Sequence, residues 1–75
     1  MQAPVIHVDF NNADASGRVR LNTVAALADI ETLEEPLSDG MRVRLIDDDL
    51  STIGTAMFSP ADQMWLAAVD WELIR

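Results

Sequence analysis

The stretch MRVRLIDDDLSTIGTAMFSPADQMWLAAVDW (residues 41–71) predicts three β-strands in the second half of the chain. Residues 41–47 alternate aliphatic and basic or acidic side chains, the period of a strand with one buried face. The next strands are expected at 52–58 and 64–71, joined across SPADQ, where Pro60 fits the second position of a type I turn. The aspartates of DDD (residues 47–49) are ordinary turn formers and are expected between the first two of these strands.

The first half of the chain repeats the alternation in VIHVDF (5–10) and RVRLNT (18–23). We expect these segments to close as a hairpin around residues 11–17, which are rich in turn formers. One register buries all the aliphatic residues together and predicts an exposed pair between Asp9 and Arg18. In that register Val8 lies opposite Val19, Ile6 opposite Leu21 and His7 opposite Arg20.

Between the two halves, TVAALADIETLEEP (23–36) loses the strand alternation and predicts a helix near 24–34. Thr23 is a suitable N-cap and Pro36 ends the helix. The face expected to pack on the sheet carries Val24, Leu27, Ala28 and Leu33, with Ile30 at its margin.

The expected order is β-β-α-β-β-β in a single domain, residues 1–75, of mainly β (α+β) class. Five short strands and one helix predict a small, strongly bent antiparallel sheet or an SH3-like barrel. The alternative is an open α+β sheet with the helix packed across one face. RVRL occurs at 18–21 and at 42–45, but the residues that follow differ, so strand alternation explains the likeness better than a repeat.

The charge balance disfavours several classes of partner. Thirteen acidic residues against five arginines, without lysine, give a formal charge of −8, which repels nucleic acid and anionic membranes. The chain has no cysteine for a disulfide or a thiolate metal site. The start of the sequence lacks the features of a signal peptide, and no apolar run approaches the roughly 20 residues that span a bilayer. We therefore expect a cytoplasmic protein.

No catalytic constellation emerges from the sequence, and we expect no enzyme activity, cofactor or metal. NADASG (12–17) resembles the start of a calcium loop, but Thr23 stands where the bidentate glutamate is needed. Calcium binding by this loop is kept as one alternative function. Asp47–Asp49 read as a solvated turn rather than a magnesium site, and His7 has no second histidine to share a metal with.

Arginines supply a second alternative, a nucleic-acid-binding barrel. If the second and third strands lay side by side, their wet faces would form one cationic strip. That candidate binding site consists of Arg18, Arg20, Arg42 and Arg44.

The last two strands predict self-association. With Phe58 opposite Met64, both faces of this hairpin are apolar, whereas a half-exposed antiparallel sheet has one polar face. A helix near 24–34 is too short to cover a whole sheet, so we expect a homodimer with Phe58, Met64 and Leu66 at its interface. The competing explanation is a closed barrel that buries these residues under its helix and loops.

The segments GRVRLNT, GMRVRLIDDD and the final DW resemble small uncharacterised bacterial proteins of similar size. The resemblance implies a bacterial origin and transfers no activity. The charge and the apolar hairpin lead us to expect a small protein–protein interaction or regulatory module with an unknown protein partner.

Overall fold

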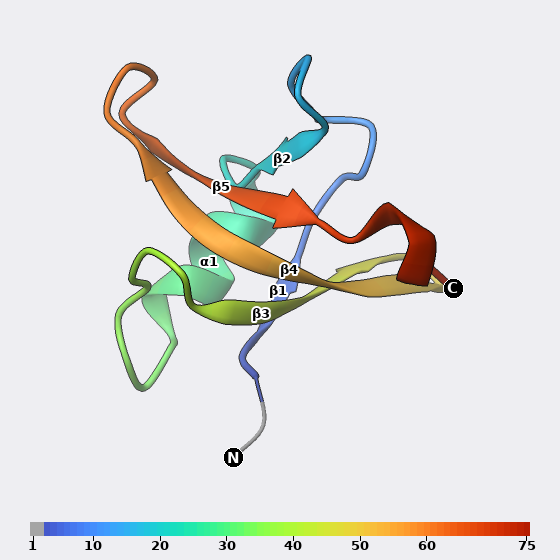
Figure 1. Ribbon diagram of the computed structural model, residues 1–75. Helices are drawn as coiled ribbons and strands as arrows, with labels where there is room; N and C mark the ends of the chain where they lie inside the picture. The colour runs from blue at the N-terminus through green and yellow to red at the C-terminus, as the bar shows by residue number, and fades with distance from the viewer. Residues whose placement is uncertain (1–2) are drawn as a thin grey trace.

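A computed structural model describes residues 3–75 and shows one mixed, open five-stranded sheet with a helix on one face (Figure 1). The elements are β1 (Val5–His7), β2 (Arg18–Arg20), α1 (Val24–Glu31), β3 (Arg42–Asp47), β4 (Leu50–Ser59), β5 (Met64–Val69) and the 3-10 turn η1 (Trp71–Leu73). The order across the sheet is β1-β3-β4-β5-β2. The mainly β, α+β class is confirmed, in the open form with the helix across one face. None of the helices in residues 3–75 is long and apolar enough to cross a membrane.

The predicted β1–β2 hairpin is wrong, because these strands form the two opposite edges of the sheet. β1 runs parallel to β3, and β2 runs antiparallel to β5. Consequently the sheet is not purely antiparallel, and Asp9 does not pair with Arg18. The alternation still identified the buried residues, since Ile6 and Val19 are both fully buried. A period of two selects the face of a residue, but the neighbouring strand depends on tertiary structure.

One hydrophobic core fills the space between the sheet and α1. Its largest fully buried side chains come from three strands and the segment after β2, and they are Ile6, Leu21, Leu45, Val19 and Val43. Small residues, Ala56 and Ala67, face each other in the centre of the sheet on β4 and β5. Ala26 of the helix is also fully buried and belongs to the same cluster.

The helix begins as predicted but presents a different face to the sheet. Thr23 caps it, since its side chain accepts a hydrogen bond from the backbone N–H of Ala26. Ala26 is buried and Ile30 packs against the core, whereas Val24 is 87% exposed and Leu27 51% exposed. The prediction that Val24, Leu27 and Ala28 face the sheet is therefore wrong, and only Leu33 of the expected set packs on the core.

Asp29 provides the physical reason for this rotation of the helix. One carboxylate oxygen of Asp29 accepts the backbone N–H of His7 at 2.7 Å and lies 2.9 Å from the His7 ring Nδ1. The backbone N–H of His7, on edge strand β1, thereby gains a hydrogen-bond acceptor. Positions 26, 29 and 30 lie on one side of the helix, so the bond to β1 brings Ala26 and Ile30 toward the core, where Leu33 joins them from the segment after the helix.

This orientation predicts the effect of two substitutions in the helix. Leu27→Ala is expected to change the free energy of unfolding by less than about 1 kcal/mol, because the leucine is half exposed. Ala26→Leu is expected to cost about 1–3 kcal/mol, because the larger side chain does not fit between helix and sheet. Urea unfolding of both variants checks the prediction; a large loss in Leu27→Ala would contradict the orientation.

The contact with His7 also predicts an acid dependence. Burial raises the pKa of Asp29, but the hydrogen bonds and charge of His7 outweigh it, so the pKa lies below the ordinary 3.8. A carboxyl with a lowered pKa stabilises the fold above its unfolded pKa and loses this effect as the pH falls through the folded value. The stability difference between the parent and Asp29→Asn should therefore be fully present at about pH 5 and shrink as the pH falls toward about pH 2. Chemical unfolding at a series of pH values measures it, and a difference independent of pH would contradict the contact.

The C-terminal strands form where expected, but their register is shifted by one residue. Phe58 lies opposite Trp65 and Ser59 opposite Met64, so the predicted pairing of Phe58 with Met64 is wrong. The turn spans four residues, 60–63, because Gln63 takes a left-handed conformation (φ 52) and the Ser59 hydroxyl bonds Asp62. The predicted last strand ends at Val69, and Trp71 begins η1 instead.

Both edges of the sheet are covered by groups of the chain itself. At the β1 edge, the N–H of His7 donates to Asp29. At the β2 edge, the Arg20 N–H donates to the Asn12 carbonyl, and the Arg18 carbonyl accepts the Asp14 N–H. These bonds engage some of the backbone groups through which another strand would add to the sheet.

Candidate functional site

The candidate site is the face of the sheet opposite α1, which no other element covers in the part of the chain that the structure describes. Paired residues point to the same face of a sheet. The pairing of β2, β3, β4 and β5 therefore defines this outer face by nine residues: Arg18, Arg20, Arg42, Arg44, Ile53, Thr55, Met57, Leu66 and Ala68. Its central row reads Arg42, Thr55, Ala68 and Arg18 across the four strands.

All four arginines predicted for the wet face lie on the outer face, but they do not form one strip. β4 and β5 separate β2 from β3. The Cα atoms of Arg42 and Arg18 are therefore three strand spacings apart, roughly 14 Å. The condition for one strip, a side-by-side placement of the second and third strands, is not met, because β2 pairs with β5 and β3 lies between β1 and β4.

The two arginines of β2 are engaged by the preceding loop. Arg18 Nε donates to the Asp14 carboxylate at 3.0 Å, and Arg20 donates to the Asn12 side chain. The pKa of Asp14 is lowered mainly by the hydrogen bond from the Arg18 backbone N–H, with further help from the Ser16 N–H and the guanidinium, against some burial. The Asp14 and Asn12 oxygens of the proposed calcium loop thus accept bonds from neighbouring residues.

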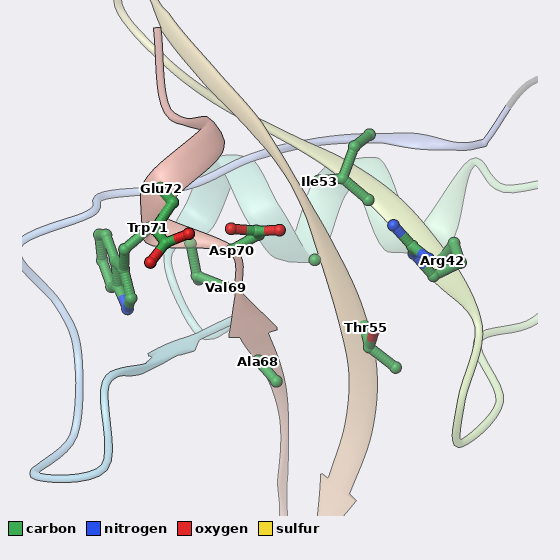
Figure 2. Close-up of a pocket in the computed structure, with 9 residues that line it drawn as sticks. Arg42, Ile53, Thr55, Ala68, Val69, Asp70, Trp71 and Glu72 are labelled. Carbon is green, nitrogen blue, oxygen red and sulfur yellow. The ribbon is translucent and has the colours of Figure 1, made fainter.

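The two arginines of β3 are different, because Arg42 and Arg44 are exposed and form no ion pair within residues 3–75. Across β4 from them lie two exposed carboxylates, Asp70 and Glu72. Figure 2 shows Arg42 on one side of β4 and both carboxylates on the other. An open depression of about 580 Å³ connects the two sides and is lined by Arg42, Ile53, Gly54, Thr55, Ala68, Val69, Asp70, Trp71 and Glu72.

A second open depression continues along β4 and shares Ile53 with the first. It is lined by Arg44, Ser51, Thr52, Ile53, Leu73 and Arg75. All five arginines of the chain therefore lie on or beside the outer face, although the whole chain carries a charge of −8. The surface between the two charged flanks is made of Ile53, Thr55 and Ala68, so an apolar strip separates cations from anions.

The acidic flank is held in place through its backbone. The Asp70 N–H donates to the Ile53 carbonyl at 3.1 Å, and the buried Thr52 hydroxyl donates to the Asp70 carbonyl at 2.7 Å. The indole N–H of Trp71 donates to the Gly17 carbonyl at 2.9 Å, and its ring packs edge-on against Phe10. The Asp70 carboxylate makes no capping bond to η1 and remains available at the surface.

The residues expected at a dimer interface do not form one patch. Phe58 is on the helix side of the sheet, where it packs against Trp65 with ring centroids 5.4 Å apart. Met64 and Leu66 point to the outer face, and Leu66 is only 1% exposed. The one-residue shift of the register separates them. Whether these residues meet another chain stays a prediction.

The remaining acidic candidates, Asp47 and Asp48, lie at the end of β3 and in the turn that follows it. The Asp47 carboxylate accepts the backbone N–H of Phe10 at 3.0 Å, and Asp48 occupies the β3–β4 turn with a φ of 52. Within residues 3–75, no three His, Asp or Glu side chains are grouped so as to hold a metal ion. Comparisons with known proteins give no match to a family model, to a curated protein or to a solved structure.

Sequence reasoning missed Asp70 and Glu72 as members of the site. The sequence shows Asp70 as a single charge among apolar residues, but it does not show that Asp70 lies opposite Ile53. The one sequence feature that pointed to this surface was the absence of a polar face in the last two strands.

Proposed function

We propose that this chain is a small cytoplasmic protein–protein interaction module, without catalytic activity, that binds its partner through the outer face of the sheet. The observation that carries the proposal is the uncovered apolar strip between the Arg42–Arg44 flank and the Asp70–Glu72 flank. Apolar surface between charged rims is the usual arrangement of a protein interface.

Two other modes of binding fit the geometry less well. Addition of a partner strand requires a free sheet edge, and bonds within the chain already engage backbone groups at both edges. Small-molecule sites are concave and enclose most of their ligand, whereas both depressions here are wide open. A broad partner surface suits the outer face better.

Capture from an extract of the native host tests the proposal with a matched pair of variants. Ala68 is exposed on the outer face, and Ala25 is exposed on α1. Ala68→Arg is expected to abolish capture of the partner, whereas Ala25→Arg, with the same change of volume and charge, is expected to retain it. Mass spectrometry compares the captured proteins, and a partner equally retained by Ala68→Arg would overturn the proposed surface.

Nucleic-acid binding remains the second candidate, because all four arginines of β2 and β3 share one face. However, an apolar strip lies between these arginines, and two carboxylates lie beside it. Both features are unfavourable for binding a phosphate backbone. A gel shift with single-stranded RNA and with duplex DNA at several salt concentrations tests this candidate. A complex that weakens steeply with salt and is lost in Arg42→Ala/Arg44→Ala would favour it over a protein partner.

A further inference from the structure

We propose that the partner on the outer face is a second copy of this chain, related by a two-fold axis that runs along β4 between the two sheets. This inference rests on the proposed function and names its partner. It follows from the opposite charges that stand at equivalent positions on the two sides of β4. Arg44 lies on the β3 side of Ile53, and Asp70 lies on the other side.

Rotation about an axis parallel to β4 brings the β3 side of one copy over the β5 side of the other. Arg44 of each copy then lies over Asp70 of its mate, so the operation creates the same ion pair twice. Arg42 lies in the next row, over Ala68 of the mate and on the side of Glu72. Such an isologous contact closes after two copies and leaves no free binding surface of the same kind.

The residues on the axis suit contact with themselves. The outward side chains of β4 are Ile53, Thr55 and Met57, all half-buried in the single chain and none of them charged. Side chains on a two-fold axis meet their own copies, and charged ones would repel there. Two sheets stacked in this way have nearly aligned strands, the common packing of β-sandwiches.

The charge distribution favours this face over the exposed helix face. Two chains of charge −8 repel each other, and a contact made where the arginines gather reduces that repulsion. The exposed side of α1 carries Val24 and Leu27, but the helix also contains Glu31 and no arginine. A contact between two copies there would not reduce their repulsion. A contact between two copies also needs enough surface. A standard interface buries about 800 Å² of each partner, which is roughly a sixth of the 4936 Å² accessible surface of this chain.

A charge-swap experiment tests the inference by analytical ultracentrifugation over micromolar to millimolar concentrations. The parent is expected to form a dimer. Arg44→Asp and Asp70→Arg are each expected to raise the dissociation constant by about 10-fold or more, since each places two pairs of like charges in contact. The double variant Arg44→Asp/Asp70→Arg keeps the net charge of the parent and is expected to restore most of the affinity, because the swapped pairs form again.

Glu31→Arg on α1 is the control for Asp70→Arg, with the same change in net charge, and should leave the dimer intact. A parent that stays monomeric at all concentrations would overturn the two-fold dimer. If Ala68→Arg still lost its captured protein in that case, the outer face would bind a different protein and the proposed function would stand. A dimer split by Leu27→Glu and unaffected by the charge swap would overturn the dimer on the outer face, because it would place the contact on α1; the proposed function would then fall only if Ala68→Arg also retained its captured protein.

Discussion

Replacement of Leu45 by alanine is expected to lower the free energy of unfolding by about 2–5 kcal/mol. Leu45 is fully buried in β3, between Ile6 of the parallel neighbour and Thr52 of the antiparallel one. Truncation would leave a cavity at the centre of the sheet. A natural domain is stable by only about 5–15 kcal/mol, and one of 75 residues belongs near the lower limit, so much of the protein would unfold.

Leu50 provides the matched control, because it is a leucine of the same hairpin with 43% of its surface exposed. Leu50→Ala is expected to cost less than about 1 kcal/mol. Urea denaturation followed by tryptophan fluorescence measures both variants. Equal losses at the two positions would contradict the placement of Leu45 in the core.

Gly54→Ala is expected to cost about 1–3 kcal/mol, although alanine normally stabilises a strand relative to glycine. A Cβ atom at this position would lie 2.7 Å from Leu45 Cδ1, 3.1 Å from the Ala68 carbonyl oxygen and 3.5 Å from the Ala67 Cβ. The first distance is shorter than side chains tolerate, and the backbone oxygen cannot move aside without disturbing the β4–β5 ladder. Glycine is therefore required here by close approach.

A double-mutant cycle separates this clash from a general loss of packing. Leu45→Val removes the Cδ1 atom that the new Cβ would meet. The cost of Gly54→Ala should therefore be smaller in the Leu45→Val background, with a coupling of about 0.5–3 kcal/mol. Additive effects of the two substitutions would mean that Leu45 is not the obstructing neighbour.

The two halves of the site differ in how far the sequence reveals them. Alternation places Arg42 and Arg44 on the wet face of β3, and the structure agrees. Their relation to Asp70 depends on the register of β4 with β5 and on the turn of the chain into η1. Because Asp70 follows the end of the ladder, no periodic pattern predicts where its carboxylate lies.

The turn at 60–63 shows how a single residue changes a surface. A five-residue turn would put Phe58 opposite Met64, on the same face as Leu66, and the four-residue turn puts Phe58 opposite Trp65 on the other face. Pro60 predicts a turn in both cases. The left-handed conformation of Gln63 decides its length, and glutamine gives no strong signal for that conformation.

What the sequence by itself determined is the type of each element and, in the strands, the buried face. The period of two identified Ile6, Val19, Val43 and Leu45 as core residues, and Thr23 marked the start of the helix. These properties are local, because they depend on side-chain direction along one segment and on a cap within one turn.

The tertiary structure alone decided which elements are neighbours. β1 and β2 are adjacent in the sequence, yet they form opposite edges because each completes hydrogen bonds with a strand of the C-terminal meander. The helix could bury either of two apolar stripes, and the bond between Asp29 and the His7 N–H selected the one with Ala26. Both choices depend on hydrogen bonds between residues 22 or more positions apart, and such bonds leave no periodic trace in the sequence.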